Sequence, residues 1–440
     1  TFLSQVIKMV EECQGSKVPI QEFADRVTAY FVPAVLVIAA LTFMLWLILP
    51  GPMGAVSGWA REFIPWVNPE HGIVTLAIFA TVAVLVIACP CALGLATPTA
   101  LMVGSGMGAE HGILIRDGAA IQTLRDVRVI VFDKTGTITR GKPEVTDIIP
   151  AIGREADDVL RLAASVESGS EHPLARAIVN RAMEMELVPL EGFQSIAGKG
   201  VRGELNGDAV SVGSRKLLDD MDSPPWVENE LSRLEGEAKT VILVAKNGRI
   251  EGIIAVADAL KEDSIEAIQE LENMGLETAM ITGDNRRTAG AIAKKVGISK
   301  VLAEVLPDGK VAAIRQLQEE GKIVAMVGDG INDAPALKQA NVGIAIGTGT
   351  DIAIEASDVT LVSGQLSAVV SAIKLSRATF RKIRENLYWA FGYNVLAIPL
   401  AIMGLLHPII AEIAMAGSSV SVVTNANRLR KVDITGFGKA

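Results

Sequence analysis

The sequence from Val127 to Thr137, VRVIVFDKTGT, decides the fold class of this chain. A β-branched run ends here at an acidic residue, and similar short runs recur at Val241–Ala245, Thr278–Thr282 and Ile323–Val327. Helical segments lie between these runs, so the pattern predicts an α/β sheet. In such sheets ligands bind outside the carboxyl ends of the strands, which is where the acidic residues stand.

The acidic residues after three of these runs, Asp133, Asp284 and Asp329, are therefore expected to share one site. A carboxylate at a strand end can attack phosphorus, and Gly136 allows backbone N–H groups to approach a phosphate. Phosphoryl transfer also needs cations and a metal ion to offset charge. The residues suitably placed after later strands are Lys310, Asp329 and Asp333. An ordinary turn with a solvated aspartate is the alternative, and the coincidence of several acidic strand ends disfavours it.

Four long stretches of the chain are almost free of charge. Val27–Ala60 and Gly72–Ala109 contain no charged residue, Asn386–Ala411 is interrupted only by His407, and Ile413–Asn427 follows. The first three exceed the roughly 20 residues that cross a bilayer, whereas a buried soluble core would show shorter runs. The sequence therefore predicts about four membrane spans.

Basic residues flank these stretches on one side of the predicted membrane, in agreement with the positive-inside rule. They are Lys8, Lys17, Arg26, Arg377, Arg381, Lys382, Arg384, Arg428, Arg430 and Lys431. The segment from about Glu110 to Arg384 is then cytoplasmic, and membrane lipid is an expected partner. The formal net charge is -9 and no basic stripe is present, which argues against nucleic acid as a partner.

Residues from about Asp147 to Ile254 form an insertion between two strands of the sheet, which predicts a second domain. Within it, Gly198 to Gly203 matches the GxGxxG pattern of dinucleotide-binding proteins, but a hairpin signal at Asn206-Gly207 follows instead of a helix. We therefore expect these glycines to let the backbone approach a nucleotide closely. His172 stands at a helix start, where a single histidine is more often structural.

The triplet Cys89-Pro90-Cys91 lies in the middle of the second uncharged stretch. Pro90 removes a backbone donor and must bend or unwind the helix, which lets both sulfurs converge. Thiolates are soft ligands that favour copper(I), zinc or similar ions, although two cysteines that only pack are the alternative. Because Cys13 is the single remaining cysteine, no disulfide framework is expected.

Polar groups at membrane depth elsewhere in the chain indicate function. Tyr393 and Asn394 lie in the third stretch, and Met415 and Ser419 stand four residues apart on one face of the fourth. Glu412 shares that face about one turn towards the exterior. It either accepts departing metal or faces water at the membrane interface.

Three motifs together resemble the signature set of the P-type ATPases: DKTGT at Asp133–Thr137, TGD at Thr282–Asp284 and GDGIND at Gly328–Asp333. The resemblance implies membrane helices and a haloacid dehalogenase-like, doubly wound parallel sheet with an inserted α+β nucleotide-binding domain. It also implies an aspartyl phosphate that forms on Asp133 from ATP. The implied catalytic residues are Asp133, Lys134, Thr135, Thr282, Gly283, Asp284, Lys310 and Asn332, and the implied Mg²⁺ ligands are Asp133, Asp329 and Asp333.

Further motifs are similar to those of the heavy-metal subgroup and its copper(I) transporters: SEHP followed by GKG, then CPC, YN and MxxxS. By that likeness the ATP contacts are Glu167, His172, Gly198, Gly200, Gly213 and Arg215, although Ser214 departs from the Asn of the subgroup. The implied copper residues are Cys89, Cys91, Tyr393, Asn394, Met415 and Ser419, with Asp25 where copper enters the membrane. Zinc and cadmium relatives share CPC but carry a Lys and an Asp in the last two spans, and the sequence has neither there.

The resemblance covers the chain as the carboxyl-terminal portion of such a pump. The expected segments are 1–109 with two membrane helices, 110–146 and 255–384 as the two parts of the phosphorylation domain, 147–254 as the nucleotide domain, and 385–440 with two membrane helices and a tail. The sequence shows no actuator Thr-Gly-Glu motif, leading membrane helices or amino-terminal CxxC domain. We expect such segments, and a copper chaperone, as partners.

The expected function is ATP-driven export of copper(I), with the plasma membrane of a prokaryote as the expected location. A zinc or cadmium pump portion is one alternative. A phosphatase of the haloacid dehalogenase type is another, but it would not need the membrane spans or Cys89 and Cys91. A non-catalytic membrane metal binder would leave Asp133, Lys310 and Asp329 unexplained.

Overall fold

The computed structural model describes residues 19–196, 198–218, 224–347 and 351–436. These residues form two compact units. The helical unit comprises the described residues up to Asp126 together with Ser371–Ile434, and the α/β unit comprises Val127–Val370 with Thr435 and Gly436. Cys13, Lys8 and Lys17 lie outside the described residues.

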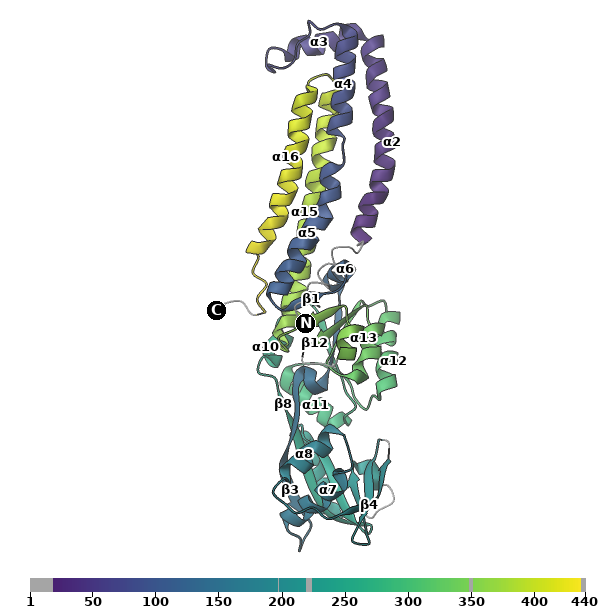
Figure 1. Cartoon of the computed structure of the whole chain (residues 1–440), viewed down its shortest axis with the longest axis vertical. Coiled ribbons are helices and arrows are strands. Elements are labelled where there is room, and N and C mark those ends of the chain that lie inside the picture. Colours follow the sequence, from purple (N-terminus) through teal and green to yellow (C-terminus); the bar gives the residue numbers. More distant parts are fainter. Residues whose placement is uncertain (1–18, 197, 219–223, 348–350, 437–440) are drawn as a thin grey trace. The chain divides into compact units, whose positions relative to one another are not determined.

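The helical unit is a bundle in which α2, α4, α15 and α16 run alongside one another, with α3 at one end (Figure 1). Small residues from all four long helices, namely Ala39, Ala83, Ala401 and Ala411, share one buried cluster, because small side chains let helices approach closely. The elements are α2 (Pro19–Ile48), α3 (Pro50–Ala60), α4 (Ile73–Ile87), α5 (Cys91–Glu110), β1 (Ile113–Ile115), α6 (Gly118–Asp126), α15 (Ser367–Ile402, from Ser371 in this unit), α16 (Pro408–Asn427) and η4 (Arg428–Lys431).

Three helical stretches of the described chain are long and apolar enough to cross a membrane. They are Pro19–Ile48, Ile73–Glu110 and Pro408–Lys431. The first uncharged stretch of the sequence is divided, because α2 ends at Ile48 and Pro50 begins a separate helix.

By length and hydropathy, three of the expected spans qualify among the residues that the structure describes. The stretch Asn386–Ala411 forms the second half of α15 and the turn into α16. Asn386, Tyr393 and Asn394 make this half of α15 more polar than the other long helices. Its apolar residue Ala397 nevertheless packs in the same buried cluster as α4 and α16.

Two tryptophans hold the turn that joins α15 to α16. The indole N–H of Trp46, which is fully buried, donates to the carbonyl of Ile402 at 2.9 Å, and that of Trp66 donates to the carbonyl of Leu405 at 3.1 Å. The first bond satisfies a carbonyl group that the end of α15 leaves without a helical partner, and the second satisfies one in the turn that follows. Gly404 has a φ of 73° and lies against the Trp46 ring.

The α/β unit contains a parallel sheet in which β2 (Val129–Asp133) is a central strand. Within this unit the strand order is β13-β12-β11-β2-β9-β10, and every neighbouring pair is parallel. β2 lies between β9 and β11, so the carboxyl ends of these three strands meet at one edge. The other strands are β9 (Glu277–Ile281), β10 (Lys300–Leu302), β11 (Val324–Gly328), β12 (Val342–Ile346) and β13 (Val359–Leu361), and the helices among them are α10 (Ser264–Asn273), α11 (Arg286–Val296), α12 (Pro307–Glu319), α13 (Ala334–Gln339) and α14 (Asp351–Ala356).

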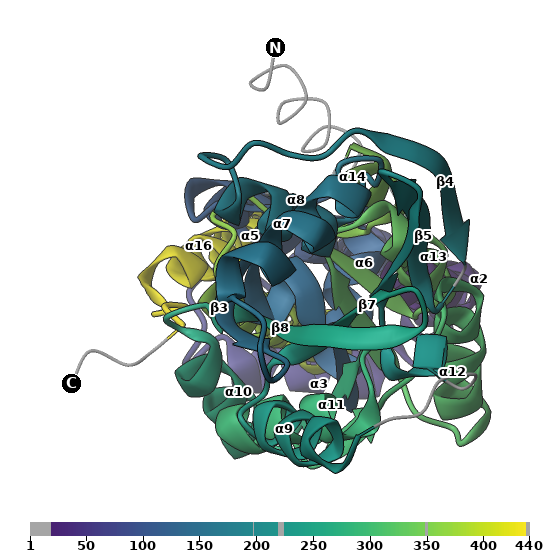
Figure 2. The same cartoon turned by 90° about the horizontal axis from the view of Figure 1, so that it is seen from below.

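A second sheet, antiparallel throughout, is inserted between β2 and β9 in the sequence. Helices α7 and α8 cover one face and α9 covers the other (Figure 2), each over its own buried apolar cluster. Its strand order is β3 (Thr139–Pro150), β8 (Arg249–Leu260), β7 (Thr240–Lys246), β6 (Asp208–Gly213), β5 (Gly200–Leu205) and β4 (Leu190–Ile196), with α7 (Ala156–Glu167), α8 (Pro173–Arg181), η2 (Arg215–Leu218) and α9 (Pro225–Gly236).

We predict that Gly404→Ala destabilises the helical unit. The new Cβ would lie 2.5 Å from the Trp46 ring, and an alanine is strained at this positive φ. The expected loss is about 1–3 kcal/mol in the free energy of unfolding. Thermal unfolding of the chain in detergent, followed by tryptophan fluorescence, measures it.

The matched control is Gly417→Ala in α16, where an added Cβ meets no heavy atom within 4 Å. This variant should unfold at the same temperature as the unchanged chain or slightly above it. Equal unfolding temperatures for both variants would show that the Gly404 turn does not depend on glycine.

Candidate active site

Asp133 is the last residue of β2, and its side chain is buried. The chain leaves the strand in the tight turn η1 (Lys134–Ile138), where Gly136 has a φ of 73°. The carboxylate of Asp133 accepts a hydrogen bond from the backbone N–H of Thr135 at 2.9 Å. A side chain at position 136 would overlap the carboxyl group of Asp329. The turn therefore needs glycine for its backbone conformation and for its close approach to Asp329.

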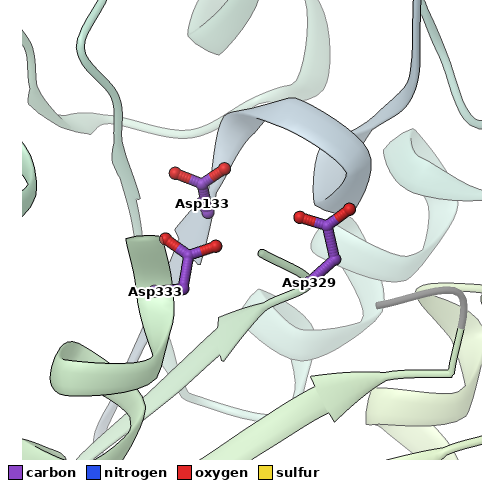
Figure 3. Close-up of side chains that lie close together, drawn as sticks. All are labelled: Asp133, Asp329 and Asp333. Carbon is purple, nitrogen blue, oxygen red and sulfur yellow. The ribbon is translucent and has the colours of Figure 1, made fainter. Parts of the chain in front are cut away.

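Three carboxylates meet at the carboxyl ends of β2 and β11 (Figure 3). Oxygen atoms of Asp133, Asp329 and Asp333 lie within 4.8 Å of one another. Asp329 follows β11 directly, and Asp333 ends the short turn η3 (Ile331–Asp333) before α13. Mg²⁺ prefers hard carboxylate oxygens, so this donor set fits the metal expected from the sequence.

Lys310, near the start of α12, joins two of these carboxylates. Its Nζ donates to Oδ1 of Asp133 and to Oδ1 of Asp333, each at 2.6 Å. All three side chains are buried. A buried cation held by two carboxylates offsets their repulsion, and removal of the cation would leave uncompensated buried charge.

Burial and the nearby charge of Asp333 raise the pKa of Asp133 to about 7, against the opposing effect of Lys310. Burial and Asp333 likewise raise the pKa of Asp329 to about 6. Burial works to lower the pKa of Lys310, but the two carboxylates beside it raise the pKa overall. One lysine does not neutralise three carboxyl groups, so the site favours a further cation.

A second ion pair links the turn after β2 to the end of β9. Nζ of Lys134 donates to Oδ2 of Asp284 at 2.6 Å, and the backbone N–H of Asp284 donates to Oγ1 of Thr282 at 3.1 Å. Gly283 lies between these two residues in the turn. The structure thus brings residues of DKTGT, TGD and GDGIND to one edge of the sheet, while Thr135 and Asn332 are exposed there.

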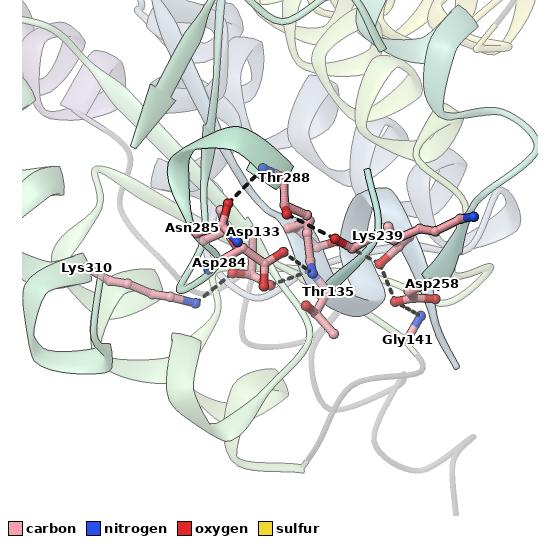
Figure 4. A network of polar contacts seen from close by, with 12 residues as sticks. Asp133, Thr135, Gly141, Lys239, Asp258, Asp284, Asn285, Thr288 and Lys310 are labelled. Carbon is pink, nitrogen blue, oxygen red and sulfur yellow. Dashed lines mark hydrogen bonds and ion pairs between the residues drawn. The ribbon is translucent and has the colours of Figure 1, made fainter. Parts of the chain in front are cut away.

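Asp258 in β8 supports this site, and the sequence analysis did not identify it. Its carboxylate accepts hydrogen bonds from Oγ1 of Thr139 at 2.6 Å, from the N–H of Gly141 at 3.0 Å and from the N–H of Lys142 at 3.1 Å (Figure 4). These bonds fix the start of β3 directly after the turn that carries the site. The available signal was one acidic residue in the otherwise apolar run Ile253–Leu260.

Lys261 is a further residue that the sequence analysis missed. Its Nζ donates to the carbonyl of Gly364 at 2.8 Å, and burial lowers the pKa of Lys261. Its charge opposes the rise in the pKa of Asp329. Lys261 therefore adds a second partly buried cation beside the carboxylates.

In the inserted domain, Glu167 and His172 lie at the two ends of the loop between α7 and α8. Glu167 is the last residue of α7, and burial raises its pKa to about 7 in spite of a hydrogen bond with Ser170. His172 caps α8, where its Nδ1 accepts a hydrogen bond from the N–H of Leu174 at 3.2 Å. The cap is the structural role that a single histidine at a helix start suggested, and it leaves Nε2 available for a ligand.

The glycines of the inserted domain lie on the neighbouring strands β5 and β6. Gly200 and Gly213 are directly paired, and a side chain on either would overlap a backbone carbonyl of the other strand or of the turn before it. Gly198, with a φ of 72°, forms part of that turn. Ser214 donates from its N–H to the carbonyl of Lys199 at 2.8 Å, and the exposed Arg215 pairs with Glu228. α7 contacts both strands, so these residues and Glu167 belong to one region of the domain.

The apolar helix breaks at Pro90, as the sequence predicted. α4 ends at Ile87 and α5 begins at Cys91. The sulfur atoms of Cys89 and Cys91 converge and are joined as a disulfide. The sequence analysis did not predict this single bond between residues two apart, which closes no long loop and is not a disulfide framework.

The other membrane residues expected at the metal site lie on α15 and α16. Tyr393 packs in the cluster that contains Ile87, just before Cys89, and its hydroxyl is buried without a hydrogen-bond partner among the described residues. Asn394 is buried, and Oγ of Ser419 donates to the carbonyl of Met415 at 3.4 Å. Asp25 and Glu412 are exposed on this unit.

The chain is similar to several known proteins. A family model of haloacid dehalogenase-like hydrolases matches residues 127–341. The chain is 53% identical over 435 residues to a probable copper-exporting P-type ATPase V of Mycobacterium tuberculosis, which covers 98% of this chain and 54% of that protein. It is 52% identical over 444 residues to copper-transporting ATPase 1 of Rhizobium meliloti, with 98% of this chain and 51% of that protein covered.

Among solved structures, a zinc-transporting PIB-type ATPase in its E2.Pi state is similar, with a TM-score of 0.71 and 36% identity over 97% of this chain and 66% of that chain. The chain spans about half the length of the curated relatives it matches. The fold class expected from the sequence is confirmed: the chain combines membrane-type helices with a haloacid dehalogenase-like sheet that carries an inserted α+β domain.

The raised pKa values of Asp133 and Asp329 predict that the chain without divalent cations loses stability as pH rises. The folded chain holds these protons up to about pH 7 and about pH 6, whereas the ordinary pKa of an aspartate is 3.8. The stabilisation by these two protonated carboxyl groups is complete below about pH 3.8. It is lost as the pH rises through about 6 and about 7. Asp133→Asn cannot ionise, so it should reduce the loss by at least about 1 kcal/mol. Thermal unfolding in EDTA across this pH range measures it.

The control is Asp157→Asn, an exposed aspartate in the first turn of α7. It should leave the pH dependence unchanged. If Asp133→Asn also leaves it unchanged, the carboxyl of Asp133 is not held protonated by burial and by Asp333.

Proposed function

The chain belongs to the P-type ATPases, and on that premise we propose that it is the catalytic and metal-gate portion of a pump that exports copper(I) with energy from ATP. The copper-exporting relatives match it along nearly its whole length. The observation that carries the proposal is the convergence of Asp133, Asp329 and Asp333, two of which, Asp133 and Asp333, hold Lys310. A solvated turn or a passive metal binder would not need this buried arrangement.

The carboxylate of Asp133 is placed to act as the nucleophile. One of its oxygens attacks the γ-phosphorus of ATP, the bond from that phosphorus to the β–γ bridging oxygen breaks, and ADP leaves with the electron pair. Lys310 offsets charge on the attacking carboxylate and on the transferred phosphoryl oxygens. Asp133, Asp329 and Asp333 would hold Mg²⁺, which would supply further charge neutralisation. Lys134 and Asp284 fix the two neighbouring turns.

ATP is the phosphoryl donor in this proposal, and the inserted domain binds it. Gly200 and Gly213 let β5, β6 and the turn at Lys199 approach one another closely, and we propose that this backbone faces the nucleotide. Glu167 and His172 offer a protonatable carboxyl and a free ring nitrogen on the adjoining loop. Arg215 contributes a cation.

Copper(I) is the proposed cargo, and Cys89 and Cys91 are its main ligands. The break at Pro90 points both sulfurs to one place, and their disulfide must be reduced by two electrons before two thiolates can hold the ion. The hydroxyl of Tyr393, the amide of Asn394 and the pair Met415 and Ser419 complete the proposed route. The copper-exporting relatives are more similar to this chain than the zinc-transporting structure is.

The whole pump requires more than this portion in our proposal. Actuator and leading membrane segments hydrolyse the phosphoenzyme and complete the path, Asp25 receives copper where it enters the membrane, and a copper chaperone delivers it. The membrane is the plasma membrane of a prokaryote. The chain's own contribution is the coupling of a phosphorylated carboxylate to a membrane thiolate pair.

We predict that copper(I) stimulates hydroxylamine-sensitive phosphorylation of the reduced chain by ATP and Mg²⁺. Asp133→Asn should abolish labelling, because the acyl phosphate forms on that carboxylate. Cys89→Ala should reduce the stimulation by copper(I) at least about tenfold and leave the basal labelling unchanged. Radiolabel retained on the chain after acid quenching measures both effects.

Zinc serves as the competing ion in the same assay. Stimulation by zinc rather than copper(I) would favour the alternative of a zinc or cadmium pump. If neither metal ion nor Cys89→Ala changes the labelling, the proposed coupling to a metal site is wrong. The chain would then have only the chemistry of an isolated phosphatase-type domain.

We also predict that Glu412→Gln slows the release of copper(I). Glu412 lies in the first turns of α16, one turn before Met415, and its exposed carboxylate can accept the departing ion. Copper-stimulated phosphorylation should stay within about twofold of the unchanged chain, because the thiolate pair is intact. Transfer of bound copper(I) to an external chelator measures release, and an unchanged rate would remove Glu412 from the route.

A further inference from the structure

A basic cavity lies in the helical unit between α6 and the middle of α15. Its volume is about 300 Å³. Four arginines and one glutamate line it, together with aromatic rings: Arg125, Arg377, Arg381, Arg384, Glu385 and Tyr388. The proposed transport chemistry uses none of these residues.

The negative groups near the cavity are already engaged. The carboxylate of Glu385 accepts hydrogen bonds from Nζ of Lys382 at 2.7 Å and from the amide of Asn425 at 3.1 Å. Asp126 is bound by the guanidinium of Arg125 through two hydrogen bonds, at 2.7 and 2.6 Å. The lining therefore has more positive charge than these carboxylates neutralise.

Two of the arginines remain available for a ligand. Across the part of the chain that the structure describes, neither Arg381 nor Arg384 forms a salt bridge, and both side chains are exposed. Arg125, in contrast, is held in place, since its guanidinium stacks 3.6 Å from the centre of the Phe380 ring. The cavity thus combines a fixed guanidinium with two that can move to a bound anion.

The cavity lies where α15 passes from polar to apolar sequence. Tyr388 is 68% exposed and Trp389 is 67% exposed, and the uncharged stretch of α15 continues after them. Exposed tyrosine and tryptophan beside arginines mark the level of lipid headgroups at the cytoplasmic face. Phosphate groups of lipids lie at this level, and basic pockets there bind anionic headgroups.

We propose that this cavity binds a phosphate ester group, supplied by an anionic lipid headgroup or by a soluble phosphate compound. Guanidinium groups form paired hydrogen bonds with phosphate oxygens, and several arginines around one cavity match a group with several such oxygens. The ring of Phe380 holds Arg125 at one wall of the cavity, and Arg384 lies 5.9 Å from the centre of the Tyr388 ring. None of the lining residues is assigned to the proposed copper route, so either proposal can fail while the other stands.

The test uses the chain reconstituted in phosphatidylcholine vesicles that contain dansyl-labelled phosphatidylglycerol, with energy transfer from tryptophan as the readout. The Arg381→Gln, Arg384→Gln double variant should bind the labelled lipid about tenfold more weakly, because two cations near the headgroup are lost. The matched control is Arg428→Gln, Lys431→Gln, which removes two exposed basic residues after α16 outside the cavity. It should change binding by less than about threefold.

Inorganic phosphate added to the unchanged chain distinguishes the two sources. Displacement of the labelled lipid by millimolar phosphate supports a soluble ligand, and resistance to it supports a lipid headgroup. Equal weakening in both double variants, or equal transfer to dansyl-labelled phosphatidylcholine, would overturn the proposal, because general attraction between a basic surface and the membrane would then explain the binding. Circular dichroism of each variant confirms that the helices are intact.

Discussion

The buried cation of Lys310 between Asp133 and Asp333 is the interaction on which the α/β unit depends. Strand order places Asp133 and Asp329 side by side, because β2 and β11 are neighbours with their carboxyl ends at one edge. Gly136 then allows the carboxyl of Asp329 to approach the turn. Lys310 does not fully offset the burial and mutual repulsion of these carboxylates, so the pKa values of Asp133 and Asp329 remain raised. A divalent ion and a phosphoryl group fit the site because each redistributes that charge.

The sequence predicted the residues that share this edge, because buried parallel strands are uniformly apolar and each of these ends at a polar residue. It did not reveal Asp258, which accepts hydrogen bonds from one hydroxyl and two backbone N–H groups 116 to 119 residues away. Contacts at such separations leave no periodic pattern. The roles of Asn332 and of the ATP residues stay predictions, since the geometry alone assigns them no ligand. The short motifs predicted more of the site than composition or periodicity did, because they mark turns with fixed backbone requirements.

In the helical unit, proline positions were the most informative feature of the sequence. Pro50 and Pro90 divide the uncharged stretches where a regular helix cannot continue, and the second break brings two sulfurs together. The number of spans was harder to predict, because the polar residues Asn386, Tyr393 and Asn394 lower the hydropathy of α15. The hydrogen bond from Trp46 to Ile402 joins residues 356 positions apart, and nothing local in the sequence indicates it.

The central place of β2 also has a consequence for how the chain is made. Its partners β9 and β11 come late in the sequence, after the entire inserted sheet of β3 to β8. A ribosome therefore releases the inserted domain as a complete unit first, while the apolar run Val129–Phe132 has no strand to pair with. During that interval the run is a site for aggregation or for chaperone binding. The parallel sheet can therefore fold only after its last strands have been synthesised. Truncated nascent chains are expected to carry a folded inserted domain next to an unfolded parallel sheet.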